Sequence, residues 1–135
     1  MKTIITGLFF FMFINLCGQN YIGLHKDSIE SILKKTEKSF RLDNSTVNKV
    51  YKYLKYVDRI NEQTWLFFLD SIDICTHHKL MSDYLNYNET VAKLNDKYEM
   101  DKKNSWKFVD QGKTYAVTLT EGEWYFTVLT KEFKQ

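Results

Sequence analysis

The chain has 135 residues and a formal net charge of +2, with 44% hydrophobic, 16% aromatic and 27% charged residues and no proline. This length fits one domain of ordinary size, and the composition excludes a disordered tail, because such tails carry few aromatic residues and many charges of one sign. The near-neutral charge excludes a strong general attraction to polyanions, so we expect no nucleic-acid partner.

The first nineteen residues differ in character from the rest of the chain. Lys2 precedes an apolar run from Leu8 to Leu16, about half of the roughly 20 residues that a helix needs to span a bilayer. A basic start and a short apolar stretch that ends in small residues are typical of a secretory signal peptide. We therefore predict a signal peptide over residues 1–19 and an exported, periplasmic or secreted domain over residues 20–135, with no transmembrane span after cleavage.

Cys17, near the end of this segment, leaves an alternative open. In a lipoprotein signal this cysteine would be acylated and would become the mature N-terminus, attached to the membrane. In an ordinary signal it would be removed, and Cys75 would be the single remaining thiol. A disulfide within the mature chain would then be impossible, so its stability must come from packing.

The predicted domain begins with an amphipathic helix over residues 27–40. Ile29, Leu33 and Phe40 recur at helical spacing, and Asp27 followed by Glu30 resembles a capping box. A cluster of turn-forming polar residues follows and should end this helix.

Three strands are expected next, over residues 49–57, 64–69 and 72–81. Aromatic and β-branched residues favour the first, and a continuous apolar run indicates that the second is covered on both faces. The third alternates, which predicts one buried face and one exposed face. The face expected to be buried carries Ile72, Ile74, Thr76, His78 and Leu80.

The second half of the chain repeats this order. A helix is expected over residues 88–100, and three strands should follow over residues 105–130, joined by turns at Gly112 and Gly122. In the last strand, Trp124 begins the row that we expect to face the core.

These elements predict an α+β fold with two helices packed on one face of an antiparallel sheet of five or six strands. Matches between the halves, residues 24–82 and 83–135, suggest a tandem αβββ repeat. Such matches also arise by chance between amphipathic helices, so a repeat and a single unrepeated domain both stay open.

Residues 23–29, Gly-Leu-His-Lys-Asp-Ser-Ile, resemble the Gly-(Met/Leu)-(Thr/Ser)-Lys-(Asp/Glu)-x-Val opening helix of small bacterial envelope modules of the SmpA/OmlA and β-lactamase-inhibitor-protein-like group. The whole chain also resembles small uncharacterised exported proteins of Bacteroidota, through the Cys-Gly-Gln-Asn end of its signal and its Trp-Leu-Phe-Phe-Leu and Glu-Trp-Tyr-Phe-Thr-Val strands. These resemblances imply an envelope or secreted module whose role is binding, and they assign no activity.

Asp73, Cys75 and His77 are the candidates for a metal or thiol site, because alternate residues of one strand point to the same side. A zinc site would need further ligands from elsewhere, and an exposed strand face with a half-buried thiol accounts for the same trio. We therefore predict no catalytic residue, no metal and no cofactor. His78, on the apolar face, is interpreted as a hydrogen-bonded packing residue.

The sequence predicts a non-enzymatic exported interaction module that holds another protein or an envelope component on its open sheet face. Its candidate binding residues are Tyr51, Tyr53 and Tyr125, because exposed aromatic side chains contribute strongly to protein interfaces. The alternatives are an envelope lipoprotein anchored through Cys17 and a metal- or thiol-dependent protein that uses Cys75 and His77. The sequence does not indicate the ligand or the oligomeric state.

Overall fold

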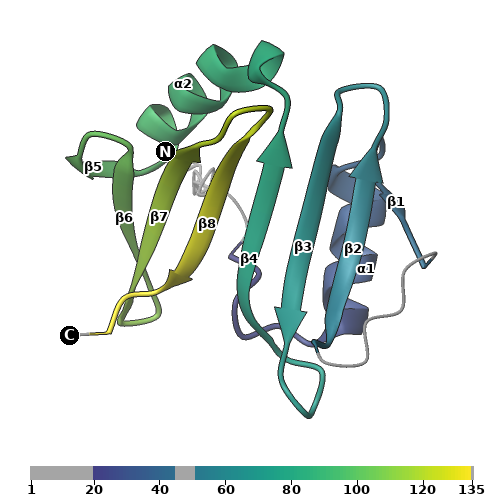
Figure 1. Cartoon of the computed structure of the whole chain (residues 1–135). Helices are drawn as coiled ribbons and strands as arrows, with labels where there is room; N and C mark the ends of the chain where they lie inside the picture. Colours follow the sequence, from purple (N-terminus) through teal and green to yellow (C-terminus); the bar gives the residue numbers. More distant parts are fainter. Residues whose placement is uncertain (1–19, 45–50, 135) are drawn as a thin grey trace, which may run out of the picture.

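The computed structural model describes residues 20–44 and 51–134 (Figure 1). Within these ranges, eight strands form one antiparallel sheet, against which two helices pack. The elements in chain order are α1 (Lys26–Thr36), β1 (Arg41–Leu42), β2 (Tyr53–Asp58), β3 (Gln63–Leu69), β4 (Cys75–Ser82), the 3-10 turn η1 (Tyr84–Asn86), α2 (Tyr87–Lys97), β5 (Glu99–Lys102), β6 (Ser105–Asp110), β7 (Lys113–Glu121) and β8 (Phe126–Glu132).

The sheet has the strand order β1-β2-β3-β4-β8-β7-β6-β5. Each half of the chain therefore supplies one helix and four neighbouring strands, and the halves meet where β4 pairs with β8 (Figure 1). This central pairing runs antiparallel from His77 opposite Lys131 to Ser82 opposite Phe126. The last strand of each half thus lies at the middle of the sheet, and the first strand of each half lies at an edge.

The predicted fold class is wrong in its strand count and in its αβββ unit, although the antiparallel sheet is confirmed. The sheet has eight strands, and each half contributes four of them. The strands that the sequence did not reveal are β1 and β5, which form the two edges and are exposed at every position. Edge strands with neither face buried lack the apolar alternation that identifies a strand, so their residues resemble helix ends and turns.

α1 begins at Lys26 because His25 caps it: the imidazole Nδ1 accepts the backbone N–H of Asp27 at 3.2 Å. The expected capping box at Asp27 is therefore wrong, and His25 satisfies a free N–H of the first turn in its place. The helix ends at Thr36 and buries Ile29 and Leu33 against the sheet.

Two hydrophobic cores lie under the helices, one for each half. The core under α1 consists of Tyr21, Ile29, Leu33, Phe40, Tyr56, Phe67 and Cys75. The core under α2 consists of Leu94, Trp106, Val117, Leu119, Phe126 and Val128. Leu80 on β4 packs against both, so the cores join at the centre of the sheet. Residues of both helices line one groove over the central strands, which places both helices on the same face.

A bulge between β3 and β4 corrects the predicted faces of the third strand. Phe68 pairs with His77 and Leu69 pairs with Cys75, so Thr76 is an extra residue that is not opposite any residue of β3 in the strand register. One extra residue reverses the alternation of side chains beyond it. Cys75 therefore enters the core under α1, Thr76 is exposed, and the predicted burial of Thr76 is wrong.

Two further predictions of burial fail for residues that lie in turns. Ile72 is 70% exposed, because the β3–β4 turn occupies the residues before Cys75. Trp124 is 79% exposed, because the Gly122 N–H donates to the Tyr125 carbonyl and extends the β7–β8 turn up to Phe126. The fully buried tryptophan is Trp106 on β6.

These positions predict opposite effects for two tryptophan substitutions. Trp106→Ala should lower the free energy of unfolding by about 3–5 kcal/mol, because it empties a core site and leaves Asn95 without the indole N–H that donates to it at 2.9 Å. Trp124→Ala should change it by no more than about 0.5 kcal/mol. Urea unfolding of both variants measures the difference, and equal losses would contradict the placement of these side chains.

Candidate functional site

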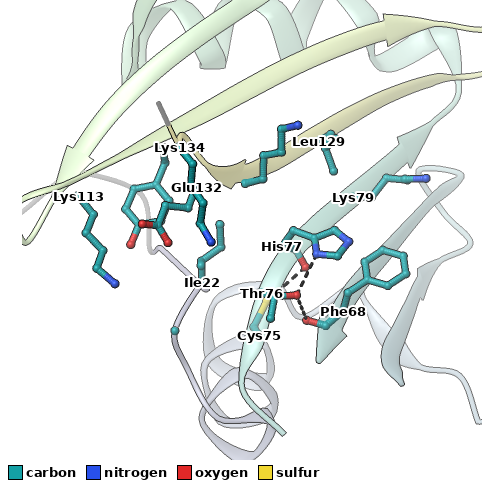
Figure 2. Close-up of a pocket in the computed structure, with 13 residues that line it drawn as sticks. Ile22, Phe68, Cys75, Thr76, His77, Lys79, Lys113, Leu129, Glu132 and Lys134 are labelled. Carbon is teal, nitrogen blue, oxygen red and sulfur yellow. Dashed lines mark hydrogen bonds between the residues drawn. The ribbon is translucent and has the colours of Figure 1, made fainter. Parts of the chain in front are cut away.

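The candidate site is a pocket at the end of the central pairing, where β4 and β8 separate. Beyond His77, β4 no longer pairs with β8 and instead bonds to the segment that precedes α1. The Gly23 N–H donates to the Cys75 carbonyl at 2.8 Å, and the Cys75 N–H donates to the Leu24 carbonyl at 2.9 Å. This change of partner leaves a pocket of about 590 Å³ between the end of β4 and the end of β8 (Figure 2).

The pocket combines an apolar lining with an excess of positive charge, and we call it the basic pocket. Phe68 and Leu129 line it from β3 and β8 (Figure 2). Its charged lining residues are Lys79, Lys113, Lys131, Lys134 and Glu132. The lining therefore carries four lysines and one glutamate, and this excess of positive charge favours an anion.

The lysines of the basic pocket have no ion-pair partner among the described residues. Two lysines elsewhere on the sheet do have partners. Lys55 lies 3.5 Å from Asp43, and Lys107 lies 3.5 Å from Asp101. Lys102 on the edge strand β5 also has no ion-pair partner among the described residues, so the basic pocket is distinguished by the gathering of four such lysines around one cavity.

His77 forms part of the floor of the basic pocket. Its ring stacks on Phe68 with the centroids 4.4 Å apart and the planes 6° from parallel. Burial, and then the charges of Lys79 and Lys131, lower the pKa of His77 below its ordinary value. The ring is therefore neutral near pH 7, and it offers a flat surface between cationic side chains.

The structure does not bring Asp73, Cys75 and His77 together. The bulge at Thr76 puts Cys75 in the core under α1, while His77 stacks on Phe68 at the opposite face. Burial raises the pKa of the Cys75 thiol to about 12, so it is not ionised near pH 7. In residues 20–44 and 51–134, no three His, Cys, Asp or Glu side chains are grouped so as to hold a metal ion.

Asp73 lies in the β3–β4 turn, away from the strand face on which it was expected. Its φ is 64°, and it pairs with Lys52 and, at 3.7 Å, with Lys26. The hydrogen bond from Lys52 is the main cause that lowers the pKa of Asp73, and Lys26 adds to it. Asp73 therefore connects the turn to the residue before β2 and to the first residue of α1, which is a structural role.

The three candidate tyrosines occupy two separate regions. Tyr53 on β2 lies 6.1 Å from Phe68, measured between ring centroids. Tyr51 lines a smaller pocket that shares Phe68 and His77 with the basic pocket. Tyr51 and Tyr53 thus extend the basic pocket across the open sheet face, whereas Tyr125 lies in the turn at the other end of β8.

That other end of β8 carries exposed apolar side chains that the sequence did not single out. Leu85 is 91% exposed and Trp124 is 79% exposed, and the Tyr84 hydroxyl donates to the Gly122 carbonyl and joins their two turns. Glu121 and Glu123 flank this set, so its charge is opposite to that of the basic pocket. One ligand would therefore not suit both ends of the strand.

Sequence reasoning missed the basic pocket because its lysines come from separate elements. Lys79 is on β4, Lys113 begins β7, and Lys131 is on β8. The available signal was the charge alternation near the C-terminus, where Lys131 and Lys134 flank a strand end. That signal identifies a site only when the pairing of β4 with β8 is known, because this pairing brings Lys79 close to Lys131.

Comparison of the chain with family models, characterised proteins and solved structures finds no match to any of them. Within the part of the chain that the structure describes, neither helix has the length and apolar character needed to cross a bilayer.

The burial of Cys75 predicts an unreactive thiol. In a chain prepared without residues 1–19, Cys75 should react with a thiol reagent such as Ellman's reagent on the order of 100-fold more slowly than in urea, because the thiolate is scarce and covered. Absorbance of the released chromophore gives both rates. Rapid reaction of the native protein would contradict the buried position and would favour thiol chemistry.

Proposed function

We propose that this chain is an exported, non-enzymatic interaction module that holds an acidic segment of another protein in the basic pocket and on the adjoining open sheet face. The observation that carries the proposal is the group of four lysines without carboxylate partners around an apolar floor. Such a group repels itself until an anion is present, so an acidic partner gains both charge neutralisation and apolar burial.

The kind of cation favours acidic side chains of a protein over a compact phosphate. All the cationic lining residues are lysines, which act as separate point charges, whereas arginine presents a planar fork that suits phosphate. Lys79 and Lys131 flank the apolar floor on neighbouring strands. A segment in which carboxylates alternate with an apolar side chain would place its carboxylates near these lysines and its apolar side chain on the apolar floor.

The aromatic residues beside the pocket supply the second part of the interface. Tyr51 is 63% exposed, and Tyr53 and Phe68 lie together on the open face next to His77. Aromatic anchors of this kind often carry most of the binding energy of a protein interface. We therefore place the partner across β2, β3, β4 and β8, with its acidic segment over the basic pocket.

Export is part of the proposal and depends on residues 1–19, which lie outside the described residues. Their basic start and short apolar run support a cleaved signal peptide, and the alternative of an anchor at Cys17 stays a prediction. The mass of the mature N-terminus separates the two. The resemblance to envelope modules likewise stays a proposal, and the positions of Cys75 and His77 give no support to a metal- or thiol-dependent function.

The proposal predicts that reversing charge in the basic pocket removes binding of an acidic peptide. A labelled peptide in which glutamates alternate with leucine and tyrosine should bind the mature chain, and Lys79→Glu with Lys131→Glu should weaken it at least about tenfold. Fluorescence anisotropy at about 50 mM salt measures the affinity, and added salt should reduce it.

The matched control is Lys102→Glu with Lys103→Glu, which makes the same change in net charge at exposed positions at the far edge of the sheet. This control should keep most of the affinity. Equal loss in both double variants would show attraction to net charge alone. That result, or no binding to the unchanged chain, would refute the proposed site.

A further inference from the structure

A second cavity lies on the helix-covered face, opposite the open face, and we call it the interhelix groove. α1 and α2 each cover their own half of the sheet, and the groove of about 440 Å³ runs between them over β4 and β8. Its floor includes Leu80 and Val128, and its walls include Phe40 beyond α1 and Leu94 on α2. This volume is within the range of about 300–1,000 Å³ that small-molecule sites occupy.

His78 lies among the apolar side chains of the groove, whose lining also includes the polar residues Gln63, Lys93 and Lys97. The Trp65 indole N–H donates to Nδ1 of His78 at 3.1 Å, which assigns Nδ1 as the acceptor and puts the imidazole proton on Nε2. Burial lowers the pKa of His78 to about 3, so the ring stays neutral and Nε2 stays a donor. Among the described residues, the hydrogen bond to Trp65 is the only one that this ring makes.

Nε2 has no protein partner and His78 is only partly covered, so this donor is open to the groove, where an acceptor on a bound molecule could replace water. The lining around His78 offers apolar contact to the rest of such a molecule, through Leu80, Val128 and Leu94. A cationic head group without an acceptor would displace that water without replacing its hydrogen bond, and it would share the groove with Lys93 and Lys97. The chemistry of the groove therefore favours an apolar body that carries an acceptor.

We propose that the interhelix groove binds a small amphiphile, such as a fatty alcohol or fatty acid, with its apolar chain over Leu80 and Val128 and its oxygen accepting the Nε2–H of His78. This site is separate from the basic pocket, on the other face of the same strands, and it does not depend on the function proposed above. It would make the chain a carrier or sensor of an apolar molecule as well as an interaction module.

The test uses decanol, kept below its solubility limit, and the mature chain with Trp124→Phe. This background removes the exposed indole, so that Trp65 in the groove and Trp106 in the core under α2 are the remaining fluorophores. We expect saturable quenching or a spectral shift with one site per chain, also seen by calorimetry. Intermolecular NOEs from the alkyl chain to the methyl groups of Leu80 and Val128 should locate it.

Two variants of α2 give a matched pair. Thr90 lines the groove, so Thr90→Phe should fill it and weaken decanol binding at least about tenfold. Ala92 is exposed on the same helix, so Ala92→Phe adds the same side chain outside the groove and should leave the affinity within about twofold. Equal effects of the two substitutions, or no saturable binding to the parent chain, would overturn the proposal.

A second probe tests the role of His78. Decyltrimethylammonium has the same alkyl chain but no acceptor, so it should bind at least about tenfold more weakly than decanol. Equal affinity of the two probes would show that apolar contact alone drives binding and would overturn the assignment of Nε2 as the recognising donor. If Thr90→Phe fails to fold, which its thermal melt would reveal, the NOEs in the parent chain decide the location.

Discussion

The antiparallel pairing of β4 with β8 is the constraint on which the rest of this structure depends. It joins two helix-plus-four-strand halves into one sheet of eight strands, and Leu80 packs into the cores of both halves beside it. Without this pairing, β4 and β8 would each become an edge strand. Their unpaired backbone groups, and the apolar side chains on their covered face, would then be open to water. The same pairing creates both candidate sites, because the basic pocket lies where it ends and the interhelix groove lies where neither helix covers it.

The two faces of this central pairing differ in charge: the open face carries lysines, whereas the histidine on the covered face is neutral. On the open face, Lys79 and Lys131 lie close enough to His77 to lower its pKa, and neither has a carboxylate partner among the described residues. On the covered face, burial keeps His78 neutral. Solvated lysines can attract a distant anion and steer its approach, whereas a neutral donor in an apolar groove acts only on a molecule that has already entered. The open face therefore suits a macromolecular partner, and the covered face suits a small one.

The parts of the fold that could be predicted from sequence are those with one clear buried stripe. α1 has Ile29 and Leu33 at helical spacing, and β7 alternates between buried and more exposed residues, so periodicity located both. β1 and β5 are exposed throughout and leave no such trace. The bulge at Thr76 depends on how two strands pair, and the pattern of one strand contains no information about it. The error over Trp124 has a similar origin, since the turn at Gly122 is longer than its single glycine suggested.

The candidate site was less predictable than the fold because its residues become neighbours only through the strand order. Tyr53 was singled out for its exposure and does adjoin the basic pocket, but the lysines that give the pocket its charge come from elements far apart in sequence. Cys75 and His77 attracted attention because their spacing suits metal and thiol chemistry, and one extra backbone residue separates them. A protonated buried thiol, a neutral covered imidazole and unpaired lysines together offer charge, shape and a single hydrogen bond. Groups of that kind can contact a partner, and this is the physical ground on which we propose binding as the role of the chain.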